Sequence, residues 1–338
     1  MVPASGIQLQ RLLLRSLRTV DFNVHAVLDP IRLGLSVPQA MALLIARRPS
    51  AIFTTGGYVA IPVLLAATAL RIPVVMWDGN VVPGRSVRLT SRLASAIAVT
   101  FPETCATLGH RRPCFVTGTP IRDALAVSRA DARATLGISA DEHLLLIFGG
   151  SQAVRRFNNS VAASLPRLVA QTHVIHITGE AGYDVAVAGR VALPDDLRSR
   201  YRPERFLADG MDLALAAADL VVGRAGSSTL SEVAAFGLPM VVVPYPHAAG
   251  HQRLNAEEMV RAGAARLVED DAFDAEALLA AAAIMDNPSE RDSMAAAARS
   301  LGSPGAAWAV AELVMAAAER RPFPDPARLE AISRGVAS

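Results

Sequence analysis

Short apolar runs alternate with amphipathic stretches along most of this 338-residue chain. Each run ends at glycine or a polar residue, and the stretch after it has the 3.6-residue period of a helix. This alternation is typical of parallel βαβ units and predicts an α/β fold. Strands are expected at 51–55, 72–77, 96–101, 114–117, 144–148, 173–177, 220–222, 240–243 and 265–268, with others at 7–14 and ending at 205–207.

Helices are expected between these strands. The first, at 23–47, should be interrupted near Pro30 and Pro38, because proline removes a backbone donor. The others are expected at 59–70, 87–94, 129–136, 161–169, 211–218, 256–262, from 275 onwards with a break at Asn287-Pro288, and at 304–319 and 326–333.

A gap in the strand pattern divides the chain, because no strand is predicted between residues 118 and 141. We therefore expect a first domain at 1–122, a linker at 123–140 and a second domain at 141–303. Helices at 304–338 should pack back across the domains. A chain of this length is long enough to bury two cores.

The clearest functional pattern lies in Asp219–Asn255. A short strand is followed by the turn Gly223–Gly226 and by a helix that begins at Ser227. Such a helix start presents unpaired N–H groups and a positive dipole end to an anion. A second strand then leads into a polar loop at 244–255, which should lie beside the first turn where open α/β sheets bind ligands. We expect the ligand to be a nucleotide diphosphate.

Two further glycine turns follow predicted strands. Gly56-Gly57-Tyr58 precedes the helix at 59–70, and Gly149-Gly150-Ser151-Gln152 precedes Arg155. Both are candidate phosphate cradles, and Arg155 suits a diphosphate because its guanidinium makes bidentate contacts. A tight turn without a ligand explains either pattern as well. Neither is the G-x-G-x-x-G fingerprint, so a nicotinamide dehydrogenase is unsupported.

Three single residues are candidates for chemistry at a hydroxyl. Glu232 lies one turn into the helix that begins at Ser227, where it could bind a ribose or simply interact well with the helix dipole. Asp78 and Asn80 follow a strand and could act as a base and its hydrogen-bond partner, or cap the loop. Position alone favours the helix-dipole interpretation of Glu232, whereas the two interpretations of Asp78 and Asn80 are equally supported.

Neither a metal nor a cofactor is expected. His247 and His251 are the nearest approach to a metal pair, and no third ligand lies within their reach along the sequence. Cys105 and Cys114 are the only cysteines, which indicates a reducing compartment and no disulfide framework. No apolar run reaches the length of a membrane span.

The charge is unevenly distributed. Residues 1–122 contain 13 Arg and four acidic residues, a net charge of +9, whereas the rest of the chain has a net charge of −7. A basic first half suits an anionic membrane surface or a phosphorylated acceptor. Ordinary solvated arginines on helix faces explain it equally well.

Taken in order, the motifs resemble one family. GGYVAIPVLLAATALRIPVVMWDGN, TGTPIR, GGSQAVR and GRAGSSTLSEVAAFGLPMVVVPYPHAAGHQRLNA are similar to segments of the MurG-type glycosyltransferases, and the resemblance covers nearly the whole chain. It implies a GT-B fold, with two Rossmann-like domains that face a cleft. It also implies transfer of N-acetylglucosamine from UDP-GlcNAc to undecaprenyl-diphosphate-linked N-acetylmuramoyl-pentapeptide, lipid I to lipid II, in peptidoglycan synthesis by an inverting single displacement.

The resemblance implies partners and residue roles as well. The partners are UDP-GlcNAc, the lipid-linked acceptor and the inner face of the cytoplasmic membrane, to which the protein would bind peripherally; no nucleic acid is expected. The base is either the family His that this sequence lacks or Asp78, and Gly56, Gly57 and Tyr58 would meet the acceptor diphosphate. The implied donor contacts are Asn80, Arg155, Thr178, the backbone near Ala208, Ser227, Ser228, Thr229, Leu230, Ser231, Glu232 and Gln252.

The chain departs from the family pattern at its start. The family begins with a strand and a glycine-rich loop that ends in His, whereas this sequence begins at Met1-Val2-Pro3. We therefore expect an incomplete N-terminal domain, a gene start placed too far downstream, and donor binding that survives better than transfer. Trp77 also stands where the family more often has His, and Thr178 where it usually has Ser.

Two other functions fit the same residues. One is a related UDP-sugar enzyme, either a glycolipid glycosyltransferase or a UDP-GlcNAc 2-epimerase. The other is a non-catalytic UDP-sugar-binding subunit that needs a separate N-terminal lobe.

Overall fold

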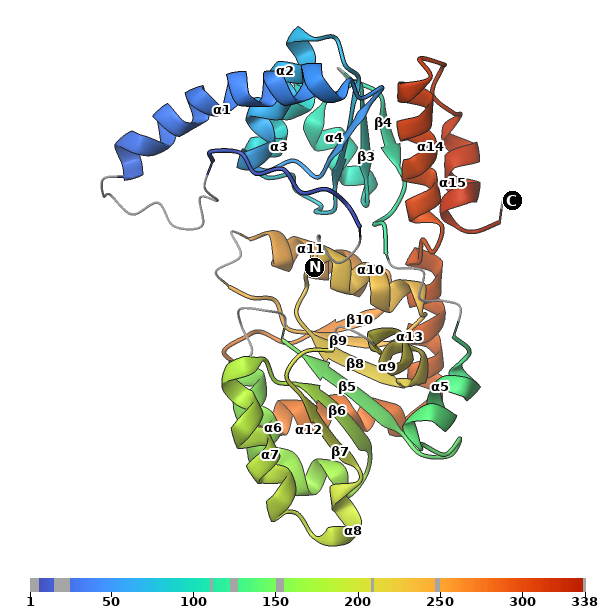
Figure 1. Cartoon of the computed structure of the whole chain (residues 1–338). Helices are drawn as coiled ribbons and strands as arrows, with labels where there is room; N and C mark the ends of the chain where they lie inside the picture. The colour runs from blue at the N-terminus through green and yellow to red at the C-terminus, as the bar shows by residue number, and fades with distance from the viewer. Residues whose placement is uncertain are drawn as a thin grey trace. The chain divides into compact units, whose positions relative to one another are not determined.

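The chain forms two compact units (Figure 1). The computed structural model describes residues 6–14, 25–109, 112–121, 127–149, 155–207, 210–246 and 250–336. One unit holds residues 1–117 and 308–332, and the other holds 118–307 and 333–336. Each is built around a parallel sheet with helices on its faces, so the predicted α/β class is confirmed.

The first sheet has four parallel strands among the described residues, in the order β1-β2-β3-β4. Val75, at the centre, pairs with Phe53 on one side and with Ala96 on the other. Strand order follows chain order, as expected for successive right-handed crossovers. The strands are β1 (Ile52–Thr54), β2 (Val74–Asp78), β3 (Ala96–Val99) and β4 (Cys114–Val116).

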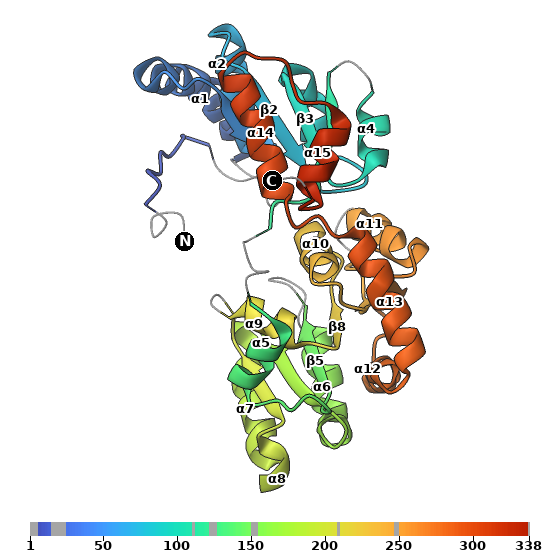
Figure 2. The same cartoon turned by 90° about the vertical axis from the view of Figure 1, so that its right-hand side faces the viewer.

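Helices from both parts of this unit cover its sheet. Leu64 packs with Met76 on one face, while Leu313 packs with Val75 and Phe115 on the other. Figure 2 shows the two C-terminal helices side by side over this second face. The helices are α1 (His25–Arg47), α2 (Ile61–Ala69), α3 (Arg85–Thr90), α4 (Pro102–Leu108), α14 (Ala306–Ala318) and α15 (Pro326–Ser333).

The N-terminal segment differs from the prediction. Residues 6–14 form no strand; the Leu13 N–H donates to Gln39 Oε1 at 3.0 Å, which ties the segment to α1 instead. Its apolar side chains are largely exposed, so the pattern that predicted a strand serves no core. α1 itself runs unbroken through Pro30 and Pro38. Its packing along α2 compensates for the hydrogen bonds that the prolines lose.

The second sheet has six parallel strands among the described residues, in the order β10-β9-β8-β5-β6-β7. Every residue of the central strand β5 is buried, because helices cover both faces. The strand that was expected to end at 205–207 instead spans Tyr201–Glu204, because the side chain of Tyr201 is buried in the core. The strands are β5 (Leu144–Phe148), β6 (His173–Ile177), β7 (Tyr201–Glu204), β8 (Leu220–Gly223), β9 (Met240–Val242) and β10 (Ala265–Leu267).

The two faces of the second sheet have separate cores. Val221 and Met240 pack with α9, α10, α11 and α13 on one face, while Val222 and Val241 pack with α6 and α12 on the other. The helices of this unit are α5 (Arg129–Leu136), α6 (Arg155–Val169), α7 (Tyr183–Ala192), α8 (Asp195–Arg198), α9 (Met211–Ala217), α10 (Ser227–Ala235), α11 (His251–Arg261), α12 (Ala275–Ala282) and α13 (Pro288–Leu301).

The segment expected to be a linker at 123–140 is largely part of the second unit. Its helix α5 packs on α9, and two arginines of α5 reach the residue before β8. Arg129 Nη2 donates to Asp219 Oδ1 at 2.5 Å, and Arg133 Nη1 donates to the Ala217 carbonyl at 2.9 Å. Asp219 also accepts the N–H of Leu144, the first residue of β5. A charged helix that resembled a linker in the sequence is therefore held by two ion pairs to Asp219, of which that of Arg133 is buried.

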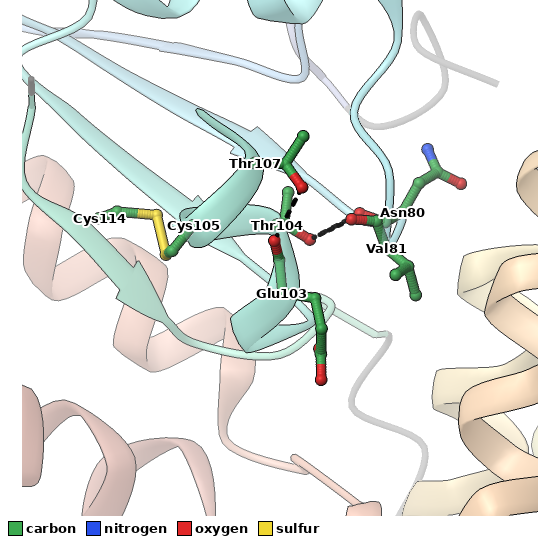
Figure 3. Close-up of a disulfide and its surroundings, with 7 residues drawn as sticks. All are labelled: Asn80, Val81, Glu103, Thr104, Cys105, Thr107 and Cys114. Carbon is green, nitrogen blue, oxygen red and sulfur yellow. Dashed lines mark hydrogen bonds between the residues drawn. A yellow bond between two sulfur atoms is a disulfide. The ribbon is translucent and has the colours of Figure 1, made fainter. Parts of the chain in front are cut away.

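The cysteines correct another prediction. Cys105 in α4 and Cys114 at the start of β4 form a disulfide, with Cα atoms 5.8 Å apart, instead of remaining reduced (Figure 3). The sequence did not show α4, which turns the chain back so that the two residues meet. The Cα separation lies in the ordinary range for a disulfide.

One stretch of the described chain is long and apolar enough to cross a membrane by length and composition alone. It lies in residues 288–318, and 44% of the window concerned is buried in the fold. The chain there forms α13 and α14, whose buried side chains belong to the cores. Both helices therefore pack on the cores, as helices of a globular fold do.

A buried polar pair joins β6 to β7. His176 Nδ1 and the Tyr201 hydroxyl are 2.9 Å apart, and both side chains are almost fully buried. Burial lowers the pKa of His176 to about 3 and raises the pKa of Tyr201. The imidazole is therefore neutral throughout the physiological pH range.

Candidate functional site

The helix start after β8 has the form that the sequence predicts. Gly226 precedes α10, whose first internal hydrogen bond runs from the Leu230 N–H to the Gly226 carbonyl at 3.0 Å. The N–H groups of residues 227–229 therefore precede the hydrogen-bonded ladder of the helix. Ser228 is exposed, and Ser227 and Thr229 are half-buried. This arrangement suits an anion such as a diphosphate.

The next three positions of α10 differ in their surroundings. Leu230 is 2% exposed and packs in the core, so its side chain is not accessible to a ligand. Ser231 Oγ donates to Thr119 Oγ1 at 2.7 Å, which fixes the chain that enters the second unit. Glu232 is half-buried one turn into the helix. Of the three side chains, that of Glu232 is best placed for a ribose hydroxyl.

The loop expected at 244–255 is shorter than predicted, because α11 begins at His251. Gln252 Oε1 accepts the Tyr245 N–H at 2.9 Å, and Asn255 Nδ2 donates to the Ala225 carbonyl at 3.4 Å. These bonds hold the first turn of α11 against the loop after β9 and the turn before α10. Gln252 thus lies on a helix, and the bond to its Oε1 fixes the orientation of its side-chain amide.

Arg224 ties the turn before α10 to the ends of β9 and β10. Its guanidinium is 5% exposed, lies 2.6 Å from Asp270 Oδ1 and donates to the Val243 carbonyl at 3.1 Å. It also stacks between the rings of Phe157 and Tyr245. Burial lowers the pKa of Arg224, and Asp270 opposes that shift. The turn that leads into the start of α10 is therefore held by several contacts.

A cavity of about 910 Å³ adjoins this cluster. Arg155, the exposed first residue of α6, lines it together with Arg156, Arg224 and Tyr245. Arg155 therefore lies at the same end of the sheet as the start of α10, although α6 covers the opposite face. This placement fits a cation that approaches a diphosphate from its other side.

The remaining donor candidates differ in what the structure shows. Thr178 is 0% exposed, and its hydroxyl lies 2.9 and 3.1 Å from the carbonyls of Gly179 and Glu204, either of which can accept its proton. That hydroxyl therefore stabilises the ends of β6 and β7 within the fold. Ala208, His247 and the turn residues 150–152 lie outside the described residues.

In the first unit, Asp78 and Asn80 form one hydrogen-bonded loop. Asp78 is 4% exposed, and its Oδ1 accepts the Asn80 N–H at 2.8 Å and Asn80 Nδ2 at 3.3 Å. The Asn80 carbonyl in turn accepts the Thr104 hydroxyl at 2.7 Å (Figure 3). The structure thus brings the two predicted residues together at the end of β2.

The glycine turn after β1 adopts a conformation that only glycine favours. Gly56 and Gly57 have φ of 72° and 85°, and a Cβ on Gly56 would lie 2.8 Å from Val87 Cγ2. The Gly56 N–H donates to Thr54 Oγ1 at 3.1 Å, and Tyr58 begins a short 3₁₀ turn that leads into α2. The close approach to Val87 accounts for Gly56 without any ligand. Gly57 has open space at its Cβ position.

Sequence reasoning missed the supporting residues of both units. Arg224, Tyr245 and Asp270 come from three strand ends, and Thr104 comes from a helix that the pattern did not predict. Of these residues, Arg224 could have been found from the sequence, because a charged residue stands there between an apolar strand and a glycine turn. Among the described residues, no group of three or more His, Cys, Asp or Glu side chains could hold a metal ion.

Comparisons with known proteins decide the family. The model of the glycosyltransferase family 28 C-terminal domain matches residues 144–309, and the model of its N-terminal domain matches residues 1–99. The chain belongs to glycosyltransferase family 28. A relative from Roseiflexus sp. (strain RS-1) is a UDP-N-acetylglucosamine–N-acetylmuramyl-(pentapeptide) pyrophosphoryl-undecaprenol N-acetylglucosamine transferase; it is 37% identical over 329 residues, which cover 86% of this chain and 74% of the relative.

Solved structures agree with the family 28 assignment. MurG of Acinetobacter baumannii has a TM-score of 0.70 and 25% identity, with 93% of this chain and 86% of that chain covered. A putative UDP-N-acetylglucosamine 2-epimerase from Listeria monocytogenes has a TM-score of 0.67 but 17% identity, over 91% of this chain and 84% of that one, and so shows the fold alone. The resemblance to MurG-type glycosyltransferases and the GT-B class are confirmed.

Proposed function

We propose that this family 28 enzyme transfers N-acetylglucosamine from UDP-GlcNAc to undecaprenyl-diphosphate-linked N-acetylmuramoyl-pentapeptide. The observation that carries the proposal is the 37% identity, across 86% of the chain, to a relative that bears this activity as its name. The epimerase alternative has only the shared fold in its favour, because two solved neighbours of that kind are 17% and 15% identical. The family assignment also makes a non-catalytic subunit the weaker alternative.

The donor would bind at the carboxyl end of the second sheet. The N–H groups of residues 227–229 and the dipole of α10 would hold the diphosphate, with Arg155 as a further cation. Glu232 would accept the ribose hydroxyls, and Gln252 would contact the sugar through the amide nitrogen. The bond from Tyr245 to Gln252 Oε1 supports this role, because it leaves the amide nitrogen to act as the donor toward the sugar.

The reaction would be a single displacement with inversion. The acceptor hydroxyl attacks the anomeric carbon while the bond to the β-phosphate oxygen breaks, and the hydroxyl proton passes to a base. Charge that develops on the departing UDP would be stabilised by the start of α10 and by Arg155, so electrostatics supplied by the protein replace a metal. Asp78 is the base candidate, and Asn80 would contact the donor sugar.

Acceptor binding would place the first unit at the inner face of the cytoplasmic membrane. On α1, Ile31, Leu35 and Ile45 are 55%, 54% and 54% exposed and share one side of the helix. The net charge of +9 over residues 1–122 favours anionic lipid headgroups. The turn at Gly56, Gly57 and Tyr58 belongs to the same unit and is proposed to meet the acceptor diphosphate.

The proposed function is tested by coupling UDP release to the acceptor. The purified chain is incubated with UDP-GlcNAc, with and without lipid I or a shorter-chain analogue. We expect UDP release only with the acceptor, and one disaccharide product for each UDP. Formation of UDP-ManNAc without an acceptor would identify an epimerase instead, and binding of UDP-GlcNAc without any turnover would identify the non-catalytic subunit.

A further inference from the structure

We infer that Thr104 is a positioning residue for Asn80. The Thr104 hydroxyl donates to the Asn80 carbonyl at 2.7 Å and lies 3.2 Å from the Val81 carbonyl (Figure 3). Its side chain is 0% exposed, so it supports the loop from the protein interior. The inference rests on the proposed function, in which Asn80 contacts the donor sugar.

Asn80 is held at three atoms, and each bond fixes a different part of it. The bonds from its N–H and Nδ2 to Asp78 Oδ1 set the start of the residue and the direction of its amide. The bond from Thr104 holds the carbonyl, and therefore the peptide plane between Asn80 and Val81. Its loss should loosen the loop that carries the Asn80 side chain and so shift the amide nitrogen relative to the sugar.

The helix that presents Thr104 is itself firmly anchored. α4 begins directly after the fully buried strand β3, and the Thr104 N–H donates to the Phe101 carbonyl at 3.1 Å. The neighbouring Cys105 is linked by its disulfide to Cys114 at the start of β4. A hydroxyl on such a helix cannot follow the loop if the loop moves, so it acts as a fixed reference point for Asn80.

The consequence for function follows from the geometry of hydrogen bonding. An amide that contacts a sugar must be placed to within about 0.5 Å to retain its effect. Thr104 lies beneath the loop and its hydroxyl is bonded to the main chain, so we assign it a role through Asn80 and not by contact with substrate. Loss of the hydroxyl should weaken binding of the sugar and leave binding of the nucleotide unchanged.

Three variants separate this role from ordinary structural support. Thr104→Val keeps the shape and removes the hydroxyl, whereas Thr104→Ser keeps the hydroxyl. Thr107→Val is the matched control: Thr107 lies on the same helix, but its hydroxyl donates to the Glu103 carbonyl within α4 at 3.0 Å (Figure 3). Asn80→Ala provides the reference for losing the sugar contact altogether.

The readout is a pair of dissociation constants, for UDP-GlcNAc and for UDP, measured by calorimetry on the purified chain. We expect Thr104→Val to weaken UDP-GlcNAc binding about tenfold, close to the effect of Asn80→Ala, with UDP binding unchanged. Thr104→Ser and Thr107→Val should match the wild type. The double variant Asn80→Ala, Thr104→Val should bind no worse than Asn80→Ala, because Thr104 acts through Asn80.

The outcomes distinguish the inference from the function on which it rests. Weakened binding in Asn80→Ala with wild-type binding in Thr104→Val overturns the inference alone. If Asn80→Ala binds UDP-GlcNAc normally, the role of Asn80 fails and the inference fails with it. Equal weakening of UDP and UDP-GlcNAc in Thr104→Val shows a merely structural role and also overturns it. Should Thr104→Val fail to fold, Thr104→Ala is measured in the same way, with the same expected split between the two ligands.

Discussion

The guanidinium of Arg224 lies 2.6 Å from Asp270 Oδ1, at the point where the turn before α10 meets the end of β10. Arg156 Nε donates to the other oxygen of Asp270 at 3.2 Å, so this carboxylate holds two arginines that line the same cavity. Together with the bond from Arg224 to the Val243 carbonyl, the contact joins the ends of β8, β9 and β10 beneath the start of α10. The turn before α10 therefore depends on one buried side chain, that of Arg224.

Arg224→Met should therefore impair both stability and nucleotide binding. Breaking a buried ion pair costs about 3 kcal/mol, and the loosened turn should reduce UDP affinity about tenfold. Arg224→Lys keeps the charge but lacks the planar group that stacks on Tyr245, so its losses should be intermediate. Urea unfolding and UDP calorimetry provide the two measurements. If a folded Arg224→Met variant binds UDP with wild-type affinity, Arg224 does not support the donor site.

Asp78→Asn tests the proposed base. The asparagine oxygen can still accept the two bonds from Asn80, so the affinity for UDP-GlcNAc should stay within about twofold. The turnover number should fall at least about 100-fold, because no group remains to take the proton. If turnover persists, the base must be sought elsewhere.

Membrane binding should depend on the apolar side of α1. Replacing Ile31 and Leu35 by Asp removes two exposed apolar side chains and adds negative charge, so partition into vesicles that contain anionic lipid should fall at least about tenfold. The matched control places Asp at Val185 and Val191, which are 67% and 62% exposed on α7 of the second unit. Sedimentation with vesicles measures both. An equal loss in the two variants would contradict a surface specific to α1.

The free energy of unfolding of the second unit should decrease as the pH falls. This decrease should begin at a higher pH than any that arises from a carboxylate with a shifted pKa. The pKa of His176 is about 3 in the fold against an ordinary 6.5, so the unfolded chain binds the extra proton between these values. Stability is fully present above pH 6.5 and falls by about 1.4 kcal/mol per pH unit below it, or roughly 3 kcal/mol by pH 4.5. Glu142, whose pKa is lowered to about 2 by bonds from Ser139 and His173, contributes only below pH 4.5.

The control for this prediction is the double variant His176→Leu, Tyr201→Phe, which removes the titrating group and its partner together. Urea unfolding between pH 6.5 and 4.5 should show a smaller pH dependence in the variant than in the wild type. Equal slopes would mean that His176 is not the source of the acid sensitivity.

Reduction of the disulfide should destabilise the first unit selectively. Cys105 and Cys114 are nine residues apart, and a cross-link across so short a loop stabilises by about 2–3 kcal/mol. Dithiothreitol, or the Cys105→Ser, Cys114→Ser variant, should lower the unfolding temperature of the first unit and leave that of the second unchanged. Calorimetry with and without UDP assigns the two transitions, because UDP should raise only the second. No shift on reduction would contradict a native cross-link.

The sequence was sufficient for the elements whose own residues determine them. Apolar runs such as 144–148 became buried strands, and α5 and α15 have the predicted bounds 129–136 and 326–333. The start of α10 was also predictable, since a glycine turn and three hydroxyl residues mark it locally.

The remaining features depend on contacts between distant residues. The first turn of α11 resembled a loop because its polar residues gain their partners, Tyr245 and Ala225, only in the fold. Residues 7–14 resembled a strand, but no neighbouring strand pairs with them among the described residues. Arg224, Asp270 and Thr104 bond to residues that lie 19 to 46 positions away in the sequence. No local pattern encodes such bonds.

The most direct test of the proposed activity is the anomeric configuration of its product. The wild-type chain is incubated with UDP-GlcNAc and a lipid I analogue, and the disaccharide is examined by proton NMR. A single displacement on the α-linked donor predicts a β-linked N-acetylglucosamine, formed in a one-to-one ratio with UDP. An α-linked disaccharide, or UDP without any disaccharide, would contradict the account.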